Sequence, residues 1–587
     1  MTRLAKLTAV ILVAAALAAA AAPWRVSRTA AAKAFADGWG PDAGLHAVAA
    51  GGVTFKLLPR PRLQATGLSA SAEDGAVLLD APLLKADLDI PSLLRGVWRM
   101  SSATLVEPTL TVDVDRLAEG SAAAHAPSHG APVMLRLRSG LLKTRSASGF
   151  ADLLVTGIDA SAAWDGRGEG LVVSGTATLR GTTAQFTGTL RDRGSGPEPA
   201  GSLASLQVES PLFDFSAKGV LSIVPQVQFA GRASFATPSL PRFLHAWDDA
   251  PASLASRRVQ IGGLLVAKLH DLSLSDAQIR LDQTRLEGSL AWRQEAGRGL
   301  VAGTLATDSL DVRSLGDPDA PDIRDLYRKA LTASPFATDV DLRISAATAR
   351  LGRVTLEDAA FAALVRGERL EVTLDEARAY GGLVKARAVL TVGADGIGAH
   401  ADVSAKRVDL GLLSDGLSGR ARLNGTITAR AALDGQGATL RDVVADLAGD
   451  GQVGVEGARV ANLSLASALH RGDRRSPLDV SRRWPATVFD RAQWDVSIRD
   501  GTVRIPKGKL TAPGLALTFD AATGLPDGRV DLHAVAAEAD AAGAPLRDSP
   551  TMPLDLRGFW AGPLVLTGGQ GGFPAVALPL GGVAAER

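Results

Sequence analysis

The sequence predicts a mainly β protein with many short antiparallel strands. Apolar and polar residues alternate with a period of two, which places the apolar side chains of a strand on one face of a sheet. Clear examples are residues 340–344, 370–374 and 515–519. Asp-Gly pairs, which tolerate the positive φ of tight hairpin turns, recur between such segments. These pairs are Asp165-Gly166, Asp395-Gly396, Asp434-Gly435, Asp500-Gly501 and Asp527-Gly528.

Composition narrows the possible functions. The 587 residues suggest about four domains, and 46% hydrophobic with 21% charged residues is typical of a folded chain. The 63 Lys and Arg residues nearly balance 62 Asp and Glu, so no overall basic field favours nucleic acid. The absence of Cys excludes disulfides, thiolate metal sites and cysteine nucleophiles. We therefore expect neither a cofactor nor a redox enzyme.

The N-terminal segment predicts export. Residues 7–22 form an uncharged run between Lys6 and Trp24. Small residues at its end would suit a cleavable signal peptide. Alternatively, residues 7–24 would form about 27 Å of helix, enough for an uncleaved anchor. We favour the anchor, and later apolar stretches are too short to span a membrane. Its expected lipid-facing residues are Leu7, Val10, Ile11, Leu12, Val13, Leu17 and Trp24.

A few short helices and loops interrupt the predicted strands. Helical periodicity occurs at residues 90–99 and 321–331, and at 439–447, where Thr439 is placed to cap the helix. Residues 462–469 and 479–490 are weaker candidates. Segments rich in Ala, Ser, Gly and Pro lie at 119–132, 191–201 and 568–572. We place domain boundaries near residues 125 and 335.

No motif in the sequence indicates a reaction. Gly449, Gly451 and Gly454 match a G-x-G-x-x-G pattern, but the predicted helix precedes the predicted strand, so we interpret them as turn glycines. His125 and His129 lie in an irregular linker. Two prolines interrupt the acidic group Asp317, Asp319 and Asp322, which favours a solvated loop over a calcium site. The sequence therefore predicts a protein that is not an enzyme.

The repeated apolar face allows two interpretations. It could be the core of a closed sandwich or barrel, or it could stay partly open and bind acyl chains. Short aliphatic residues and few aromatics leave room above a curved sheet. The expected lipid-binding residues are Val340, Leu342, Ile344, Leu370, Val372, Leu374, Leu515, Leu517 and Phe519.

Several segments resemble the AsmA family of proteins anchored in the bacterial inner membrane. Residues 86–108 are similar to the first module of the family, with Pro91, Leu93, Leu94, Gly96 and Pro108 in matching places. In the C-terminal half, similar segments are residues 338–351, 379–382, 425–457 and 498–510. The resemblance covers about residues 1–115 and 335–560.

The resemblance implies an elongated, curved antiparallel sheet, groove-like or taco-like, on one N-terminal transmembrane helix. Its parts would be an anchor (1–30), an N-terminal AsmA-like module (31–125), a middle β-rich region (126–334) and a C-terminal AsmA-like region (335–587). The expected location is the inner membrane, with the bulk in the periplasm. The expected role is outer-membrane biogenesis by binding or transferring phospholipid, with membrane lipids and envelope assembly proteins as partners. The alternative is a scaffold or adaptor that transports nothing.

Overall fold

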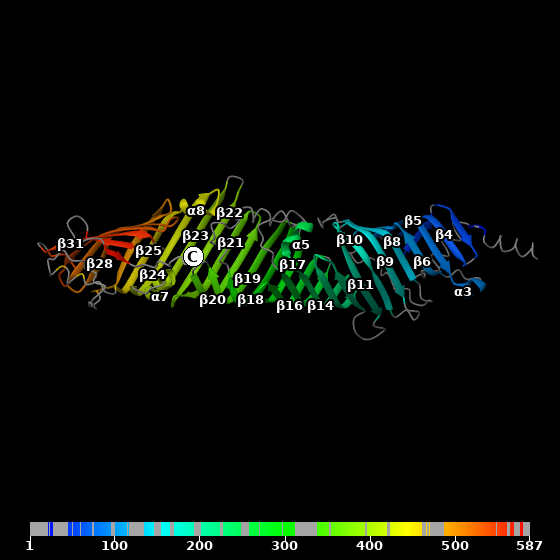
Figure 1. The fold of residues 1–587 in the computed structure, drawn as a ribbon, viewed down its shortest axis with the longest axis horizontal. Coiled ribbons are helices and arrows are strands. Elements are labelled where there is room, and N and C mark those ends of the chain that lie inside the picture. Colours follow the sequence, from blue (N-terminus) through cyan, green and yellow to red (C-terminus); the bar gives the residue numbers. More distant parts are fainter. Residues whose placement is uncertain are drawn as a thin grey trace, which may run out of the picture. The chain divides into compact units, whose positions relative to one another are not determined.

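The structure is a computed structural model, and Figure 1 shows its fold. Strands make up 79% and helices 6% of the described residues, which confirms a mainly β protein with a few short helices. The residues described are 22, 24–26, 45–49, 51–58, 60–72, 75–95, 100–113, 116, 134–145, 154–164, 170–192, 201–222, 227–247, 258–268, 270–295, 298–311, 337–351, 354–393, 396–418, 423–460, 465, 469, 487–546, 549–559, 564–568 and 576–578.

The chain divides into two units, and the division falls within two strands, β18 (Arg298–Asp311) and β19 (Ala337–Leu351). Unit 1 contains residues 1–302 and 329–338, and unit 2 contains residues 303–328 and 339–587.

Unit 1 is built from strands and two short helices. The strands are β1 (Trp24–Val26), β2 (Leu45–Ala49), β3 (Val53–Lys56), β4 (Arg62–Ala72), β5 (Val77–Leu88), β6 (Met100–Val106), β7 (Thr109–Asp113), β8 (Met134–Arg145), β9 (Leu154–Trp164), β10 (Gly170–Leu179), β11 (Thr182–Asp192), β12 (Ser202–Glu209), β13 (Asp214–Ser222), β14 (Gln228–Thr237), β15 (Val259–Lys268), β16 (Asp271–Leu281) and β17 (Thr284–Glu295). The helices are α3 (Ile90–Leu94) and α5 (Leu240–Trp247).

Strands β8 to β17 pair antiparallel in chain order. Before them, β4 pairs with β2, β3 and β5, and β1 pairs with β3. Strand β5 also pairs with β6 and β7, and both of these run parallel to β8. These pairs connect the N-terminal strands to the rest of unit 1.

Unit 2 continues the antiparallel pattern. Its strands after β19 are β20 (Val354–Arg366), β21 (Arg369–Ala379), β22 (Gly382–Val392), β23 (Ile397–Asp409), β24 (Leu423–Gly437), β25 (Ala448–Val460), β26 (Thr487–Val488), β27 (Ala492–Arg499), β28 (Thr502–Ala512), β29 (Leu515–Gly524), β30 (Arg529–Glu538), β31 (Thr551–Phe559), β32 (Leu564–Thr567) and β33 (Val576–Leu578). Its helices are α7 (Leu410–Ser418) and α8 (Leu440–Ala445). Strand β25 pairs with both β27 and the short β26.

Three clusters of buried apolar residues support these strands. In unit 1, one cluster lies on β3 to β6 and includes Leu84 and Met100. In unit 2, a cluster of mostly small residues lies on β19 to β21, with Leu356 and Leu374 as its largest members. The third is on β28 to β32 together with Leu465, Leu469 and Phe489.

The predicted helices at 90–99 and 439–447 are confirmed in shorter form as α3 and α8. In α8, Thr439 Oγ1 accepts a hydrogen bond from the backbone N–H of Asp442 (3.2 Å), and the Asp442 carboxylate accepts one from the backbone N–H of Thr439 (3.0 Å). This is the reciprocal capping box of helix N-termini. The candidate at 321–331 lies outside the described residues.

The sequence analysis missed two helices, α5 and α7. Helix α5 has apolar residues with helical spacing, and its Pro241 lies in the first turn, where proline is tolerated; Gly416 is a helix-disfavouring residue within α7. Helix α5 is held by tertiary contacts, because the Phe243 ring packs edge-on against Phe213 and Phe235, with centroids 5.7 and 5.1 Å apart. The apolar side of α5 and these ring contacts therefore act together.

The predicted turns had different outcomes. Asp500 and Gly501 connect β27 to β28 with φ of 48° and 63°, and Gly528 has φ of 67° between β29 and β30, as expected. The turn at Asp434-Gly435 is wrong, because both residues lie inside β24. A Cβ on Gly435 would lie 2.8 Å from the Val443 carbonyl oxygen of α8. That glycine therefore makes room for a helix. Asp165, Gly166 and Asp395 lie outside the described residues.

Candidate functional site

Six of the nine predicted lipid-binding residues lie on one face of three neighbouring strands. Val340, Leu342 and Ile344 of β19 pair with Val365, Ala363 and Phe361 of β20. The same β20 residues pair on their other side with Leu370, Val372 and Leu374 of β21. Because directly paired residues point to the same side of a sheet, these side chains form one surface.

The remaining three residues lie elsewhere. Leu515, Leu517 and Phe519 are on β29, where they pair with Ala512, Leu510 and Gly508 of β28. Leu515 is 1% exposed, and Phe519 is buried in the same cluster and packs edge-on against Trp494 at 5.3 Å. This part of unit 2 therefore has a closed core around Leu515 and Phe519 rather than an open surface.

The surface that begins on β19 to β21 continues across five more strands. We call it the apolar face, and every residue in three successive rows of it is apolar. The first row is Ile344, Phe361, Leu374, Ala386, Val403, Ala431, Gly451 and Val496. The second is Leu342, Ala363, Val372, Ala388, Ala401, Leu433, Gly449 and Ile498. The third is Val340, Val365, Leu370, Leu390, Ala399 and Gly435.

The middle of the apolar face is only partly covered. Val403 is 39% exposed, and Val372 is also exposed. The residues around them are mostly Ala and Gly. Where the three rows cross β22 to β25, Gly435 is buried and the other residues are half-buried or exposed. Large apolar surfaces that stay accessible are typical of sites for an apolar partner.

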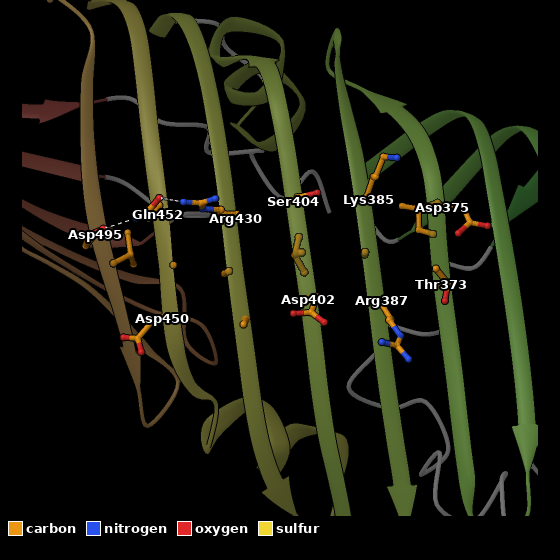
Figure 2. A pocket seen from close by; sticks show the side chains of 17 residues that line it. Thr373, Asp375, Lys385, Arg387, Asp402, Ser404, Arg430, Asp450, Gln452 and Asp495 are labelled. Atoms are coloured by element: carbon orange, nitrogen blue, oxygen red, sulfur yellow. Dashed lines mark hydrogen bonds between the residues drawn. The ribbon is translucent and has the colours of Figure 1, made fainter.

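A cavity of about 880 Å³ lies at these strands. Its lining contains six members of the first row, from Leu374 on β21 to Val496 on β27. The other lining residues are their neighbours along each strand, and all of these except Ala432 are polar or charged. Figure 2 shows the residues of this lining on adjacent strands. The volume falls within the range of roughly 300–1,000 Å³ of small-molecule sites. At a strand spacing of about 4.8 Å, the six strands extend over about 24 Å.

Two short helices lie at opposite ends of the strands that carry the cavity (Figure 1). Helix α8 is on the apolar face, since Gly435 and Gly437 of that face lie directly beneath Val443 and Asp442. At the other end, Gly416 of α7 lies against the ring of Tyr380, which packs on the small-residue cluster. The helices therefore cover the ends of the apolar face and leave its middle to the strands.

The opposite face of the same strands is polar. Glu371 accepts hydrogen bonds from Arg387 (2.8 Å) and Arg369 (3.3 Å), and the Arg387 bond is the main reason that the pKa of Glu371 is lowered. His400 Nδ1 donates to Asp434 (2.8 Å), and its Nε2 lies 3.3 Å from Asp402. The bond to Asp434 is the main reason that the pKa of His400 is raised. These pairs connect β21 to β22 and β23 to β24 on the side exposed to water.

Other candidate sites carry no chemistry in the described residues. Gly449, Gly451 and Gly454 lie within β25, so our interpretation of them as turn glycines is wrong. Gly449 and Gly451 belong to the apolar face, and Gly451 allows close strand packing, because a Cβ there would lie 2.7 Å from the Arg430 carbonyl oxygen. Within the described ranges, no group of three His, Cys, Asp or Glu side chains could hold a metal. His125, His129 and the acidic residues 317–322 lie outside these ranges.

Most of the predicted anchor also lies outside the described residues, namely Leu7, Val10, Ile11, Leu12, Val13 and Leu17. Trp24 is described, and it belongs to β1, where it pairs with Phe55. The expectation that Trp24 ends a helix is therefore wrong. Across the part of the chain that is described, no helix is both long enough and apolar enough to cross a membrane.

Sequence reasoning missed the alanine and glycine residues of the apolar face. Ala386, Ala431 and Gly451 line the cavity, and Ala388 and Ala401 lie in the next row. A signal was present, because Lys385, Ala386, Arg387 and Ala388 alternate charged and small residues with a period of two. Alanine is common in every kind of structure, so this alternation is weaker than that of Leu and Val.

The chain matches no protein-family model, no curated protein and no solved structure.

Proposed function

We propose that the chain is an AsmA-like protein of the inner membrane, single-pass, with its bulk in the periplasm, and that it serves outer-membrane biogenesis by binding or transferring phospholipid. The observation that carries this proposal is the apolar face of β19 to β27, which has no charged residue in its three rows and contributes six residues of its first row to the lining of a cavity of about 880 Å³. Membrane lipids are the proposed partners, and no reaction or cofactor is part of the proposal.

The dimensions suit an acyl chain. A bilayer's hydrocarbon core is about 30 Å thick, so one chain spans about 15 Å of it. The cavity row of about 24 Å across six strands is longer than that. Burying apolar surface contributes about 25 cal/mol per Å², which favours transfer of such a chain from water to the apolar face.

We further propose that the sheet is curved, as a groove requires. In unit 1, Gly219 and Gly231 are direct partners on β13 and β14, and a Cβ on either would collide with the backbone of the other strand. Glycine at such positions permits bends in a sheet. A smaller cavity of about 400 Å³ in unit 1 involves Leu137, Ala160 and Gly175, which are also in register.

A scaffold or adaptor for envelope assembly is the second candidate. The closed cluster on β28 to β32 favours it, because this part of unit 2 is packed like an ordinary core. The two proposals differ in whether lipid occupies the apolar face.

The test is photo-crosslinking of the full chain to labelled phospholipid in cells. A photoreactive residue at Val403, on the apolar face, should capture lipid, whereas one at Thr391, exposed on the opposite face of β22 and outside the cavity lining, should not. Ala431→Trp, which fills the cavity next to Val403, should abolish capture. Gln436→Trp, exposed on the opposite face of β24 and outside the lining, is the matched control and should leave capture unchanged. Equal capture from both faces, or none from Val403, would refute the lipid proposal and leave the scaffold.

A further inference from the structure

The end of unit 1 that lies next to the predicted anchor carries exposed apolar and basic side chains together. Strand β1 pairs antiparallel with β3, which sets Trp24 opposite Phe55 and leaves it 56% exposed. Lys56 and Leu57 follow Phe55 directly and are exposed. The apolar run 7–22 precedes Trp24 by one residue, so it joins the described chain at this end.

Helix α3 lies at the same end (Figure 1). The backbone N–H of Leu88 donates to the Pro61 carbonyl (2.9 Å), which brings the end of β5 beside the turn between β3 and β4. Helix α3 begins two residues later, after its N-cap Asp89. Leu94 of this helix is 84% exposed, and Ile90 is exposed as well. Four large apolar side chains thus share one end of the sheet, and we call this set the anchor-end patch: Trp24, Leu57, Ile90 and Leu94.

Basic side chains surround the anchor-end patch. Arg25, Lys56, Arg60 and Arg95 are exposed beside it. Arg62 pairs with Asp87 at 2.7 Å. Burial alone would raise the pKa of Asp87, but hydrogen bonds from Arg62 and Ser102 and the Arg62 charge lower it. Asp89 accepts hydrogen bonds from the backbone N–H and the hydroxyl of Ser92 (3.0 and 2.6 Å). Among the described residues beside the patch, Asp87 and Asp89 thus have partners within the module, and the basic side chains outnumber them.

We infer that the anchor-end patch docks on an anionic lipid surface. Exposed Trp and Leu beside Arg and Lys are typical of segments that enter the interfacial region, where aromatic rings lie at head-group depth and cations attract anionic lipids. This inference rests on the membrane location that is part of the proposed function. It does not depend on lipid binding by the apolar face. It assigns a membrane-contact role to the N-terminal module itself, which would fix the direction in which unit 1 leaves the bilayer.

The packing of the module supports a rigid contact. The buried cluster beneath the patch includes Leu63 on β4, Leu88 at the end of β5 and Met100 on β6. Leu93 of α3 packs against this cluster, so its neighbour Leu94 is held facing outward. A contact on a rigid element costs less conformational entropy on binding than a contact on a loop.

The experiment uses the full chain reconstituted in vesicles of phosphatidylethanolamine and phosphatidylglycerol. Because the chain has no cysteine, Leu94→Cys and Leu57→Cys allow an environment-sensitive fluorophore to be attached at single sites. Leu78→Cys is the matched control, since Leu78 is also exposed and lies in the same module. It is ten residues before Leu88 on β5, which is about 33 Å along the strand.

We expect the labels at positions 57 and 94 to shift to shorter emission wavelengths and to be quenched by lipids with nitroxide head groups. The label at position 78 should remain in water. The pair Arg60→Glu with Arg95→Glu should reduce the quenching at position 94 several-fold. The pair Lys143→Glu with Arg145→Glu, whose residues are exposed on β8 in line with Leu78, should leave it unchanged. In vesicles of phosphatidylcholine alone, the chain with both arginines should show quenching at position 94 as weak as that of the Arg60→Glu, Arg95→Glu variant.

The outcomes separate the two proposals. If the chain floats with the vesicles while labels at positions 57 and 94 stay in water, the docking surface is refuted and the anchor stands. If the chain does not float, the anchor is refuted. The labelled chain is then added to the same vesicles from solution. Binding that depends on Arg60 and Arg95 would support the docking surface in that case, and its absence would refute the docking surface too.

Discussion

Leu342 and Leu515 differ in what surrounds them, although both are aliphatic side chains on strands of unit 2. Leu342 is half-buried beside Ala363 on the apolar face, where water can reach one side of it. Leu515 is almost fully buried in a cluster with Phe519, Leu554 and Leu566. An aspartate at the first site can keep contact with water, whereas one at the second cannot.

We therefore expect Leu342→Asp to cost about 1 kcal/mol of stability, and Leu515→Asp to cost about 3–5 kcal/mol because it buries an unpaired charge. Thermal unfolding of both variants beside the wild type measures the difference. Leu342→Asp should also lose crosslinking to phospholipid while it stays folded. Similar large losses of stability in both variants would show that the apolar face is a closed core.

His400 predicts a dependence of stability on pH. It lies between Asp434 on β24 and Asp402 on its own strand. In the register of β22 with β23, Arg387 lies opposite Asp402 and Val389 lies opposite His400. Its pKa is raised in the folded state, chiefly by the hydrogen bond to Asp434. The protonated form therefore stabilises the fold fully below about pH 6.5, the unfolded value, and this contribution is lost as the pH rises through the folded pKa.

The measurement is the melting temperature of wild type and His400→Gln from pH 5 to pH 9. We expect the wild type to be the more stable at the acidic end and the difference to vanish toward the alkaline end. The effect should be small, because the pair is exposed to solvent. Asp434→Asn provides the matched control, since it removes the same partner from the other strand. A difference that grows with rising pH would contradict this assignment.

At the scale of single elements, α8 depends on a cap as well as on packing. Its six residues are too few for a stable isolated helix, so the Thr439–Asp442 capping box and the contact with β23 and β24 must hold it. Val443 is buried in that contact, directly above Gly435. The helix thereby closes one end of the apolar face.

Thr439→Ala should destabilise unit 2 by about 1 kcal/mol, the usual cost of losing an N-cap side chain. Thr439→Ser keeps a hydroxyl that can accept the same hydrogen bond and should cost much less. Hydrogen exchange of the α8 amides measures whether the loss is local. If the two variants behave alike, the cap contributes nothing and packing alone holds the helix.

At the scale of the whole molecule, the prediction concerns location. We expect the exported protein to remain in the membrane fraction after a carbonate wash, because residues 7–22 form an uncharged apolar run that as a helix would extend about 24 Å, against about 30 Å for the hydrocarbon core. Replacing Val10 and Leu12 by Arg should release it, at about 2.5–3.5 kcal/mol for each charge near the centre of a spanning helix. Recovery of a soluble wild-type form that begins near Pro23 would contradict the prediction.

The sequence by itself determined the class of the protein and the pattern of its faces. The alternation at 340–344 and 370–374 was sufficient, because a pleated strand sends successive side chains to opposite sides whatever its neighbours are. Capping chemistry also acts over three residues, which is why Thr439 identified α8. The Asp500-Gly501 turn was equally local, since its φ values depend on the residues themselves.

Only the tertiary structure decided what lies above each face. The alternation at 515–519 is the same as at 340–344, yet Leu515 is enclosed by β30, β31 and Leu465, while Leu342 is not enclosed in the same way. Likewise, Gly435 follows an Asp and has the composition of a turn, but α8 packs on it and keeps it in β24. Burial depends on residues far away in the chain, and a period of two carries no information about them.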